Sequence, residues 1–437
     1  MKNNSKGNEM SNLDTNNMKF VFINSSLLIG GIETWIVNQI RIAQRKGIEV
    51  IWLQNGPGEV FDGWRDLIDH AVKIIRFTRK SRMNVEFDTS CFSDKDKITA
   101  VCFGLVDYYN LMLFRKKLKY INEIQCFYAV PHFQNARYYP EEIFSEKSMK
   151  RKIIKRLSGR LYSQCDRMNG LLFFSPKHIE QVQKKYGIII KEKTSKMLPR
   201  IARNQYEFDK ELAEKRSERS PFTIITCGRF EFPHKGYILG LIKSYAELKQ
   251  KYPDIRLHLI GYGEGEKQIL QLLQKYPPNI KNHVKLLGAV EEKELKNYFD
   301  LAHVNISVAG GVFAGAVTGL VSIPARHYCY DCEVYGYLPE SKNMTLNDLH
   351  GEDVKKYIED LITMPKERYI SLCRKSFETY QISDEEKELY DEDRLYLLKN
   401  KNPQYYKKFI RKYCLFEIFY HFLIKIHKRR KRISNAI

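Results

Sequence analysis

The chain has 437 residues, of which 43% are hydrophobic and 13% aromatic. This length and composition exclude a wholly disordered chain and a single small core, and they predict two domains. The formal net charge of +21 makes nucleic acid, an anionic membrane and a phosphorylated substrate candidate partners. No helix-turn-helix, zinc-finger or RNP-type pattern accompanies the charge, so we expect no nucleic acid among the partners.

Three features of the sequence predict a cytoplasmic chain. Residues 1–17 are polar and lack the apolar stretch of a signal peptide, so we expect a disordered N-terminus. No run reaches the roughly 18 apolar residues that a membrane span needs. The nine cysteines are scattered, mostly through apolar segments, as expected of reduced thiols in a cytosol.

Strands and helices alternate through the first half of the chain. Short apolar runs predict strands at 19–24, 50–54, 98–104, 123–130 and 170–174. Amphipathic runs predict helices at 32–45 and 177–186. This order is typical of a mostly parallel sheet with helices on both faces. We therefore predict an N-terminal Rossmann-like domain at 18–205, followed by a charged linker at 206–220.

A second alternating series follows the predicted linker. Its strands are expected at 222–227, 256–260, 284–287 and 304–308, and its helices at 237–252, 266–274 and 294–299. The predicted fold class is α/β, with two Rossmann-like domains facing across a cleft, the second at 221–380. In such sheets ligands bind outside the carboxyl ends of the strands. Residues 381–437 are expected to form a basic helical tail that crosses back to the first domain.

The first candidate site is the turn at Gly30 and Gly31. A strand that ends in paired glycines and opens a helix presents bare backbone N–H groups and a positive helix end to an anion. Paired glycines also make ordinary tight turns, so both interpretations of this motif stay open.

The second candidate site is the loop at 227–236, which follows a predicted strand and precedes a predicted helix. Arg229 and Lys235 flank it. A planar guanidinium and a compact ammonium that converge on one loop suit a diphosphate. The alternative is a pair of solvated surface cations beside a turn.

Further glycine-rich steps are in register with that loop. Gly261 and Gly263 end the strand at 256–260, and an apolar strand at 284–288 ends in another glycine. With these pieces the chain resembles the GT-B glycosyltransferases, specifically the retaining family 4, also called glycosyltransferases group 1. The resemblance covers roughly residues 19–325, and its most specific part is the loop that holds Arg229 and Lys235.

The resemblance implies a metal-independent transfer of a sugar from a nucleoside-diphosphate sugar, with retention. It implies that His132, Arg229 and Lys235 are catalytic, and that the donor is bound by Gly30, Gly31, Arg229, Lys235, Gly261, Gly263 and Gly311. By chemistry alone a lone histidine is more often structural, so the role of His132 depends on the resemblance.

The chain departs from the family where two glutamates normally stand about eight positions apart. Ala314 occupies the place of the second, which grips the nucleotide ribose, and no acid occurs between Asp300 and Asp331. Losing a charged acceptor costs roughly 1.5–3 kcal/mol of donor binding. Either a nearby cluster supplies substitutes, or the chain is a non-catalytic GT-B subunit that binds or stabilises a partner glycosyltransferase. We favour substitutes, and the candidates are Arg326, His327, Asp331 and Glu333.

Metal sites are weakly indicated. Cys329 and Cys332 together with His327 could hold zinc, but a second ligand pair at suitable spacing is missing. The Asp-x-Asp patterns at 94–96 and 391–393 resemble those of the other glycosyltransferase fold, and we interpret both as solvated surface. We predict no metal, because fixed cations can neutralise a departing diphosphate.

Two segments, 147–160 and 405–432, interleave cations with large apolar residues. Each is either a core-facing helix with a solvated basic face or an amphipathic surface on anionic lipid. Their number and the net charge favour the membrane. We predict a peripheral protein at the inner face of the membrane, with a saccharide or lipid-linked acceptor in capsule or lipopolysaccharide biosynthesis.

Overall fold

The chain folds into two compact units. The computed structural model describes residues 14–131, 140–191, 196–199, 206–341, 350–379 and 389–434. The first unit joins Met1–Ile201 to Glu385–Ile437, and the second is Ala202–Asp384. Each unit is built on its own parallel sheet, which confirms the predicted α/β class with two Rossmann-like domains.

A parallel sheet in the order β3-β2-β1-β6-β7-β8 forms the centre of the first unit. The strands are β1 (Met18–Asn24), β2 (Glu49–Gln54), β3 (Val72–Arg76), β6 (Lys97–Cys102), β7 (Glu123–Val130) and β8 (Leu171–Phe173). The middle of β1, residues 20–23, is apolar and fully buried because helices cover both faces of the sheet. Phe20 and Phe22 enter one core layer, and Val21 and Ile23 enter the other.

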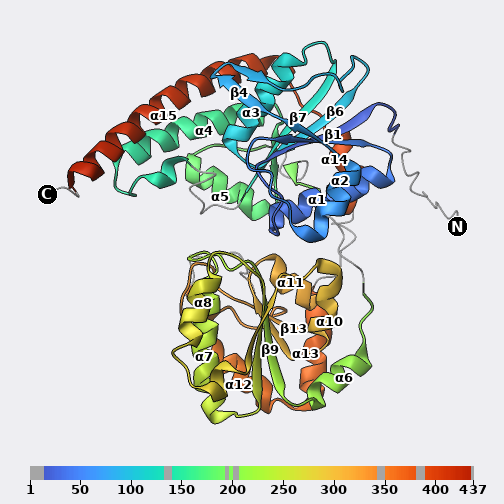
Figure 1. Ribbon diagram of the computed structural model, residues 1–437, viewed down its shortest axis with the longest axis vertical. Coiled ribbons are helices and arrows are strands. Elements are labelled where there is room, and N and C mark those ends of the chain that lie inside the picture. Colours follow the sequence, from blue (N-terminus) through green and yellow to red (C-terminus); the bar gives the residue numbers. More distant parts are fainter. Residues whose placement is uncertain are drawn as a thin grey trace, which may run out of the picture. The chain divides into compact units, whose positions relative to one another are not determined.

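Helices from distant parts of the chain build those two layers (Figure 1). The layer on Phe20 and Phe22 contains α1 (Gly31–Arg45), α2 (Arg65–Ala71) and α14 (Arg394–Leu397). The opposite layer contains α3 (Leu105–Lys117), α4 (Met149–Arg167), α5 (Pro176–Tyr186) and α15 (Tyr406–Ser434). A small antiparallel hairpin, β4 (Thr78–Ser81) and β5 (Asn84–Glu86), lies beside α3.

The C-terminal segment belongs to the core of the first unit. α14 packs in one layer and α15 in the other, so the chain between them passes across the sheet. Asn400 anchors this crossing, because its side chain accepts a hydrogen bond from the backbone N–H of Cys126 at 2.7 Å. The backbone N–H of Asn400 donates to Gln125 at 2.6 Å. The segment is therefore part of the unit's packing and more than a charged appendage.

The second unit has a parallel sheet in the order β11-β10-β9-β12-β13. Its strands are β9 (Phe222–Cys227), β10 (Ile255–Ile260), β11 (Val284–Gly288), β12 (Val304–Ser307) and β13 (Val321–Pro324). Its helices are α6 (Lys210–Glu218), α7 (Tyr237–Lys251), α8 (Glu266–Leu273), α9 (Pro278–Lys281), α10 (Leu295–Phe299), α11 (Gly310–Ala316), α12 (Val354–Thr363) and α13 (Lys366–Glu378). A short antiparallel pair, β14 (Glu333–Val334) and β15 (Glu352–Asp353), follows β13.

The predicted linker at 206–220 is instead helix α6, which packs against α13. The side chain of Arg216 on this helix is buried. Its guanidinium donates to the backbone carbonyl of Gly319 at 3.0 Å and to the carboxylate of Asp300 at 3.2 Å. These buried partners hold the segment in the second unit despite its many charged residues.

The prediction of a disordered N-terminus fails for residues 14–17, and residues 1–13 lie outside the described part of the chain. Residues 14–17 form a turn in which the backbone N–H of Met18 donates to the carbonyl of Thr15 at 3.0 Å. Lys97 also donates to the carboxylate of Asp14 at 2.8 Å.

The packing of α15 on α3 yields a stability prediction. The ring of Phe409 is fully buried and makes an edge-on contact with Tyr108 at 5.3 Å between centroids. We expect Phe409→Ala to lower the stability of the first unit by about 3–5 kcal/mol, because it leaves a cavity in the core. Chemical denaturation followed through that unit's transition measures the loss. The control is Leu397→Ala at an exposed position of α14, and an equal loss in both variants would contradict the packing.

Candidate functional site

The loop between β9 and α7 is held to its neighbour by backbone hydrogen bonds. The N–H of Gly228 donates to Ile260 at 2.9 Å, and the N–H of Phe230 donates to Tyr262 at 2.7 Å. The side chain of Phe230 is buried in the core of the second unit. Arg229 stands between these two anchored residues and is half-buried. The loop at the carboxyl end of β9 is thus fixed on both sides of Arg229.

Lys235 brings a second positive charge to the same loop. A methyl group added to Gly228 would lie 2.7 Å from Nζ of Lys235, so the ammonium lies directly over the backbone of Gly228. Burial lowers the pKa of Lys235 to about 8, and the positive charge of Arg229 acts in the same direction. The structure therefore places the two cations together at the carboxyl end of β9, where a parallel sheet binds its ligands.

Three glycines expected to contact the donor press against this loop. Gly261 and Gly263 have φ angles of +153° and +139°, which side-chain-bearing residues rarely adopt. A methyl group on Gly261 would lie 2.0 Å from the carbonyl oxygen of Gly228, and one on Gly311 would lie 2.6 Å from that of Cys227. Their absent side chains let three loops pack closely around the cations. Contact between these glycines and a donor stays a prediction.

The cluster expected to replace the missing glutamates lies beside the loop at 228–236 (the cation loop), and two of its charged residues pair with each other. The guanidinium of Arg326 donates to the carboxylate of Glu333 at 2.7 Å. Burial raises the pKa of Glu333, but hydrogen bonds from the backbone of Gly351 and from Arg326 outweigh it, so the net pKa is lowered. Asp331 is exposed. Arg326 and Glu333 thus fix their own loop, and the substitute role predicted for them loses support.

His327 is the member of that cluster that contacts the cation loop. Its Nδ1 lies 3.0 Å from Nε2 of His234, the residue before Lys235, and the two rings are stacked with centroids 5.0 Å apart. The backbone N–H of Tyr328 also donates to the carbonyl of His234 at 3.0 Å. His327 therefore connects the loop after β13 to the loop after β9.

The structure brings one acidic residue, Glu292, to the same cavity as Ala314. Ala314 lines a small cavity of about 20 Å³ together with Glu292 and Lys296. Glu292 thus reaches the cavity beside Ala314 from the segment after β11. The spacing of the sequence gave no reason to associate positions 292 and 314.

The remaining predicted donor and catalytic residues belong to the first unit. Gly30 is the N-terminal cap of α1, with an extended φ of −171°, and Gly31 is its first residue. A methyl group on Gly31 would have no neighbour within 4 Å, so the space around this helix end is open. His132 follows β7 but lies outside the described residues, so its predicted role stays a prediction.

The acidic patterns considered for metal binding have protein partners. The carboxylate of Asp96 accepts hydrogen bonds from Ser93 and is buried, contrary to the solvated position predicted for it. Glu392 and Asp393 pair with Arg45 at 2.5 Å and with Lys46 at 2.7 Å near the end of α1. In the part of the chain that the structure describes, no three histidine, cysteine, aspartate or glutamate side chains cluster as a metal site would require.

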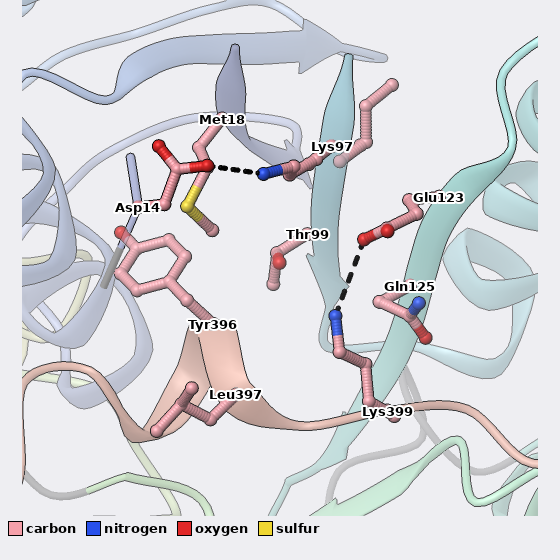
Figure 2. A pocket seen from close by; sticks show the side chains of 10 residues that line it. Asp14, Met18, Lys97, Thr99, Glu123, Gln125, Tyr396, Leu397 and Lys399 are labelled. Atoms are coloured by element: carbon pink, nitrogen blue, oxygen red, sulfur yellow. Dashed lines mark hydrogen bonds and ion pairs between the residues drawn. The ribbon is translucent and has the colours of Figure 1, made fainter. Parts of the chain in front are cut away.

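A larger cavity, of about 270 Å³, lies at the edge of the first unit's sheet where the strands begin. It is lined by Met18, Lys97 and Glu123, at the amino ends of β1, β6 and β7. The segment 396–399, which leads from α14 toward α15, covers it (Figure 2). Lys97 pairs with Asp14 at 2.8 Å and Lys399 with Glu123 at 3.5 Å. Its charges are therefore balanced, and we assign it no part in phosphate binding.

Comparisons with known proteins bear on the fold and on the sequence of the second unit. The family model described as glycosyl transferases group 1 matches residues 207–309, which include α6, Arg229 and Lys235. No curated protein matches the chain. The structure is similar to that of WaaG, a glycosyltransferase involved in lipopolysaccharide biosynthesis, with 12% identity, a TM-score of 0.51, and coverage of 84% of this chain and 96% of that one.

It is also similar to the structure of TarM, with 8% identity, a TM-score of 0.50, and coverage of 83% of this chain and 95% of that one. At these identities the likeness establishes the fold, which is GT-B. The match to the family model of glycosyl transferases group 1, over 207–309, lies within the second unit.

The lowered pKa of Lys235 predicts how anion binding depends on pH. Below about pH 8 the amine carries its charge and attracts a diphosphate, and above it the charge is lost. We expect the affinity for a nucleoside diphosphate such as UDP to fall as pH rises above 8, approaching tenfold per unit. Calorimetric titration between pH 7 and 9.5 measures this.

Lys235→Arg should remove the pH dependence, because a guanidinium stays charged throughout this range. Lys267→Ala on α8, an exposed position, should leave the wild-type profile unchanged. An affinity that does not vary between pH 7 and 9.5 in the wild type would contradict the assignment.

Proposed function

We propose that the chain is a glycosyltransferase that transfers a sugar from a nucleoside-diphosphate sugar to a saccharide, in keeping with its GT-B fold and with the group 1 match over 207–309. In this reaction the bond between the sugar's anomeric carbon and the diphosphate oxygen breaks, and the nucleoside diphosphate leaves with the electron pair. The acceptor's hydroxyl oxygen bonds to the anomeric carbon, and its proton passes to an oxygen of the departing diphosphate. The observation that carries the proposal is the joint position of Arg229 and Lys235 at the end of β9.

The two cations act on the leaving group. Negative charge on the diphosphate grows as the bond to the sugar breaks, so fixed positive charges stabilise the transition state more than the ground state. Lys235 is already partly dehydrated and held over Gly228, so little rearrangement accompanies the reaction. We expect these cations to neutralise the diphosphate without a metal ion.

Glu292 is our candidate for the carboxylate that binds the ribose. The resemblance puts the ribose-binding acid at position 314, where this chain has alanine, and Glu292 lines the same small cavity. A carboxylate that reaches this place from the segment after β11 would restore the lost acceptor. The retaining outcome and the donor contacts of Gly30, Gly31 and His132 follow from the resemblance.

For the acceptor we propose a lipid-linked saccharide at the inner face of a membrane, in the synthesis of a bacterial surface polysaccharide. The net charge of +21 and the exposed cations of α4 and α15 support work near an anionic surface.

A second candidate function is a non-catalytic subunit that binds or stabilises a partner glycosyltransferase. Ala314 favours it, because an enzyme that has lost a ribose-binding acid binds its donor less tightly.

Slow hydrolysis of the donor tests the enzymatic proposal. Purified protein is incubated with a panel of nucleoside-diphosphate sugars, and release of the nucleoside diphosphate is measured. We expect at least one donor to be hydrolysed, and Arg229→Ala to lower the rate about 10²–10³-fold, as loss of a transition-state donor does. Arg256→Ala, at an exposed position on β10, is the matched control and should leave the rate unchanged.

Glu292→Gln separates the two candidate functions further. In an enzyme that uses Glu292 for the ribose, this variant weakens donor binding about tenfold or more, because it replaces a charged acceptor with a neutral one. If no donor is hydrolysed and none binds, the enzymatic proposal fails and the non-catalytic subunit takes its place.

A further inference from the structure

Helix α15 has an apolar stripe that stays exposed in the part of the chain that the structure describes. Leu415, Ile418 and Phe422 are 68%, 44% and 58% exposed. Their spacing places them on one side of the helix. The opposite side is buried against α3 and α4 through Phe409, Tyr413 and other residues of the core. The helix is therefore apolar on two sides, and among the described residues only the buried side has a partner.

Positive charges border this stripe. Lys408, Arg411 and Lys412 are exposed, and at about 100° per residue they fall on the same arc as Leu415. The single acid of α15, Glu417, is buried on the other side, where it pairs with Arg79. The outer arc is thus cationic and apolar, without a negative charge.

Helix α4 lies beside α15 and repeats the pattern (Figure 1). Met149 and Ile153 are 66% and 38% exposed. Arg156, Arg160 and Arg167, at the same helical spacing, are exposed as well. No acid falls on this stripe, since the residues at its other positions are Lys152 and Ser163.

The cations of the two helices gather on one surface. Helices α4 and α15 pack against each other, which brings Arg160 and Arg167 into the neighbourhood of Lys408 and Lys412. Burial lowers the pKa of Lys412, and the positive charges of the other three lower it further. Within the described residues, none of the four forms an ion pair with an acidic side chain. Crowded like charges without a counter-charge indicate a surface that meets an external anion.

The chemistry of this surface selects its occupant. A second copy of the same surface would set cation against cation, and a nucleic acid would leave the apolar stripe without a partner. An anionic lipid layer offers phosphates to the cations and acyl chains to the apolar side chains. In the described part of the chain no helix has the length and hydropathy for a membrane span.

We propose that the outer faces of α4 and α15 form a docking surface for anionic phospholipid, with Leu415, Ile418 and Phe422 inserted below the headgroups. The proposal rests on the membrane location given under the proposed function, and it specifies the surface that makes the contact. It stands on the first unit alone and does not depend on the site in the second unit.

Co-flotation with vesicles tests the proposal. Full-length protein is mixed with vesicles of phosphatidylcholine alone or with 30 mol% phosphatidylglycerol (about one anionic lipid in three), and the bound fraction is measured. We expect binding to the anionic vesicles only. Because each cation near such a surface contributes about a factor of five, Arg160→Gln with Lys412→Gln should weaken partitioning about 25-fold. Leu415→Glu with Phe422→Glu should abolish binding.

The matched control is Lys267→Glu with Leu270→Glu, at exposed positions of α8 in the second unit, and it should bind like the wild type. UDP titration of every variant should give the wild-type affinity, which separates failure of this surface from failure of the donor site. The proposal is overturned if the wild type ignores anionic vesicles or if Leu415→Glu with Phe422→Glu still binds them. It is also overturned if light scattering shows a dimer that this last variant dissociates.

Discussion

The ammonium of Lys235 lies over the backbone of Gly228, near enough to Arg229 for the two positive charges to repel each other. Burial and this repulsion lower the pKa of Lys235 from 10.5 to about 8. The unfolded chain therefore binds more protons between those values, so this group's destabilising effect is full below pH 8 and fades as pH rises toward 10.5. Backbone hydrogen bonds to Ile260 and Tyr262 hold the loop in place against the repulsion. A bound anion would offset the repulsion between Lys235 and Arg229.

The need to hold the two cations of this loop close together explains why glycines surround it. Gly261, Gly263 and Gly311 lie where a side chain would strike the backbone of residues 227–230. The connection from His327 to His234 braces the loop from a further direction. The site thus depends on how closely three neighbouring loops approach one another at the carboxyl edge of a parallel sheet.

The sequence predicts the parallel strands and the cation loop because both are local patterns: an apolar run, a glycine turn and charges at fixed spacing. It could not predict α6, since a buried Arg216 among charged residues has the composition of a linker. The substitutes proposed at 326–333 were chosen for nearness in sequence to position 314. The structure pairs Arg326 with Glu333 and instead sets Glu292 beside Ala314, a neighbour that only the tertiary fold could bring there.

The C-terminal segment shows the same limit in the first unit. Its aromatic and basic composition fits either a core helix or a lipid-facing helix, and α15 has a side suited to each. Periodicity predicts a helix, but burial decides that Phe409 belongs to the core while Phe422 is exposed. The sequence alone leaves these two aromatic residues equivalent.

Proton uptake during ligand binding tests the central claim most directly. Calorimetric titration of the protein with UDP at pH 8, repeated in two buffers of different ionisation enthalpy, gives the protons exchanged on binding. A diphosphate held by Lys235 raises that residue's pKa, so we predict uptake of about half a proton per site, and none in Lys235→Arg. Binding without proton uptake in the wild type, or uptake that persists in Lys235→Arg, would contradict a diphosphate site built on this pair of cations.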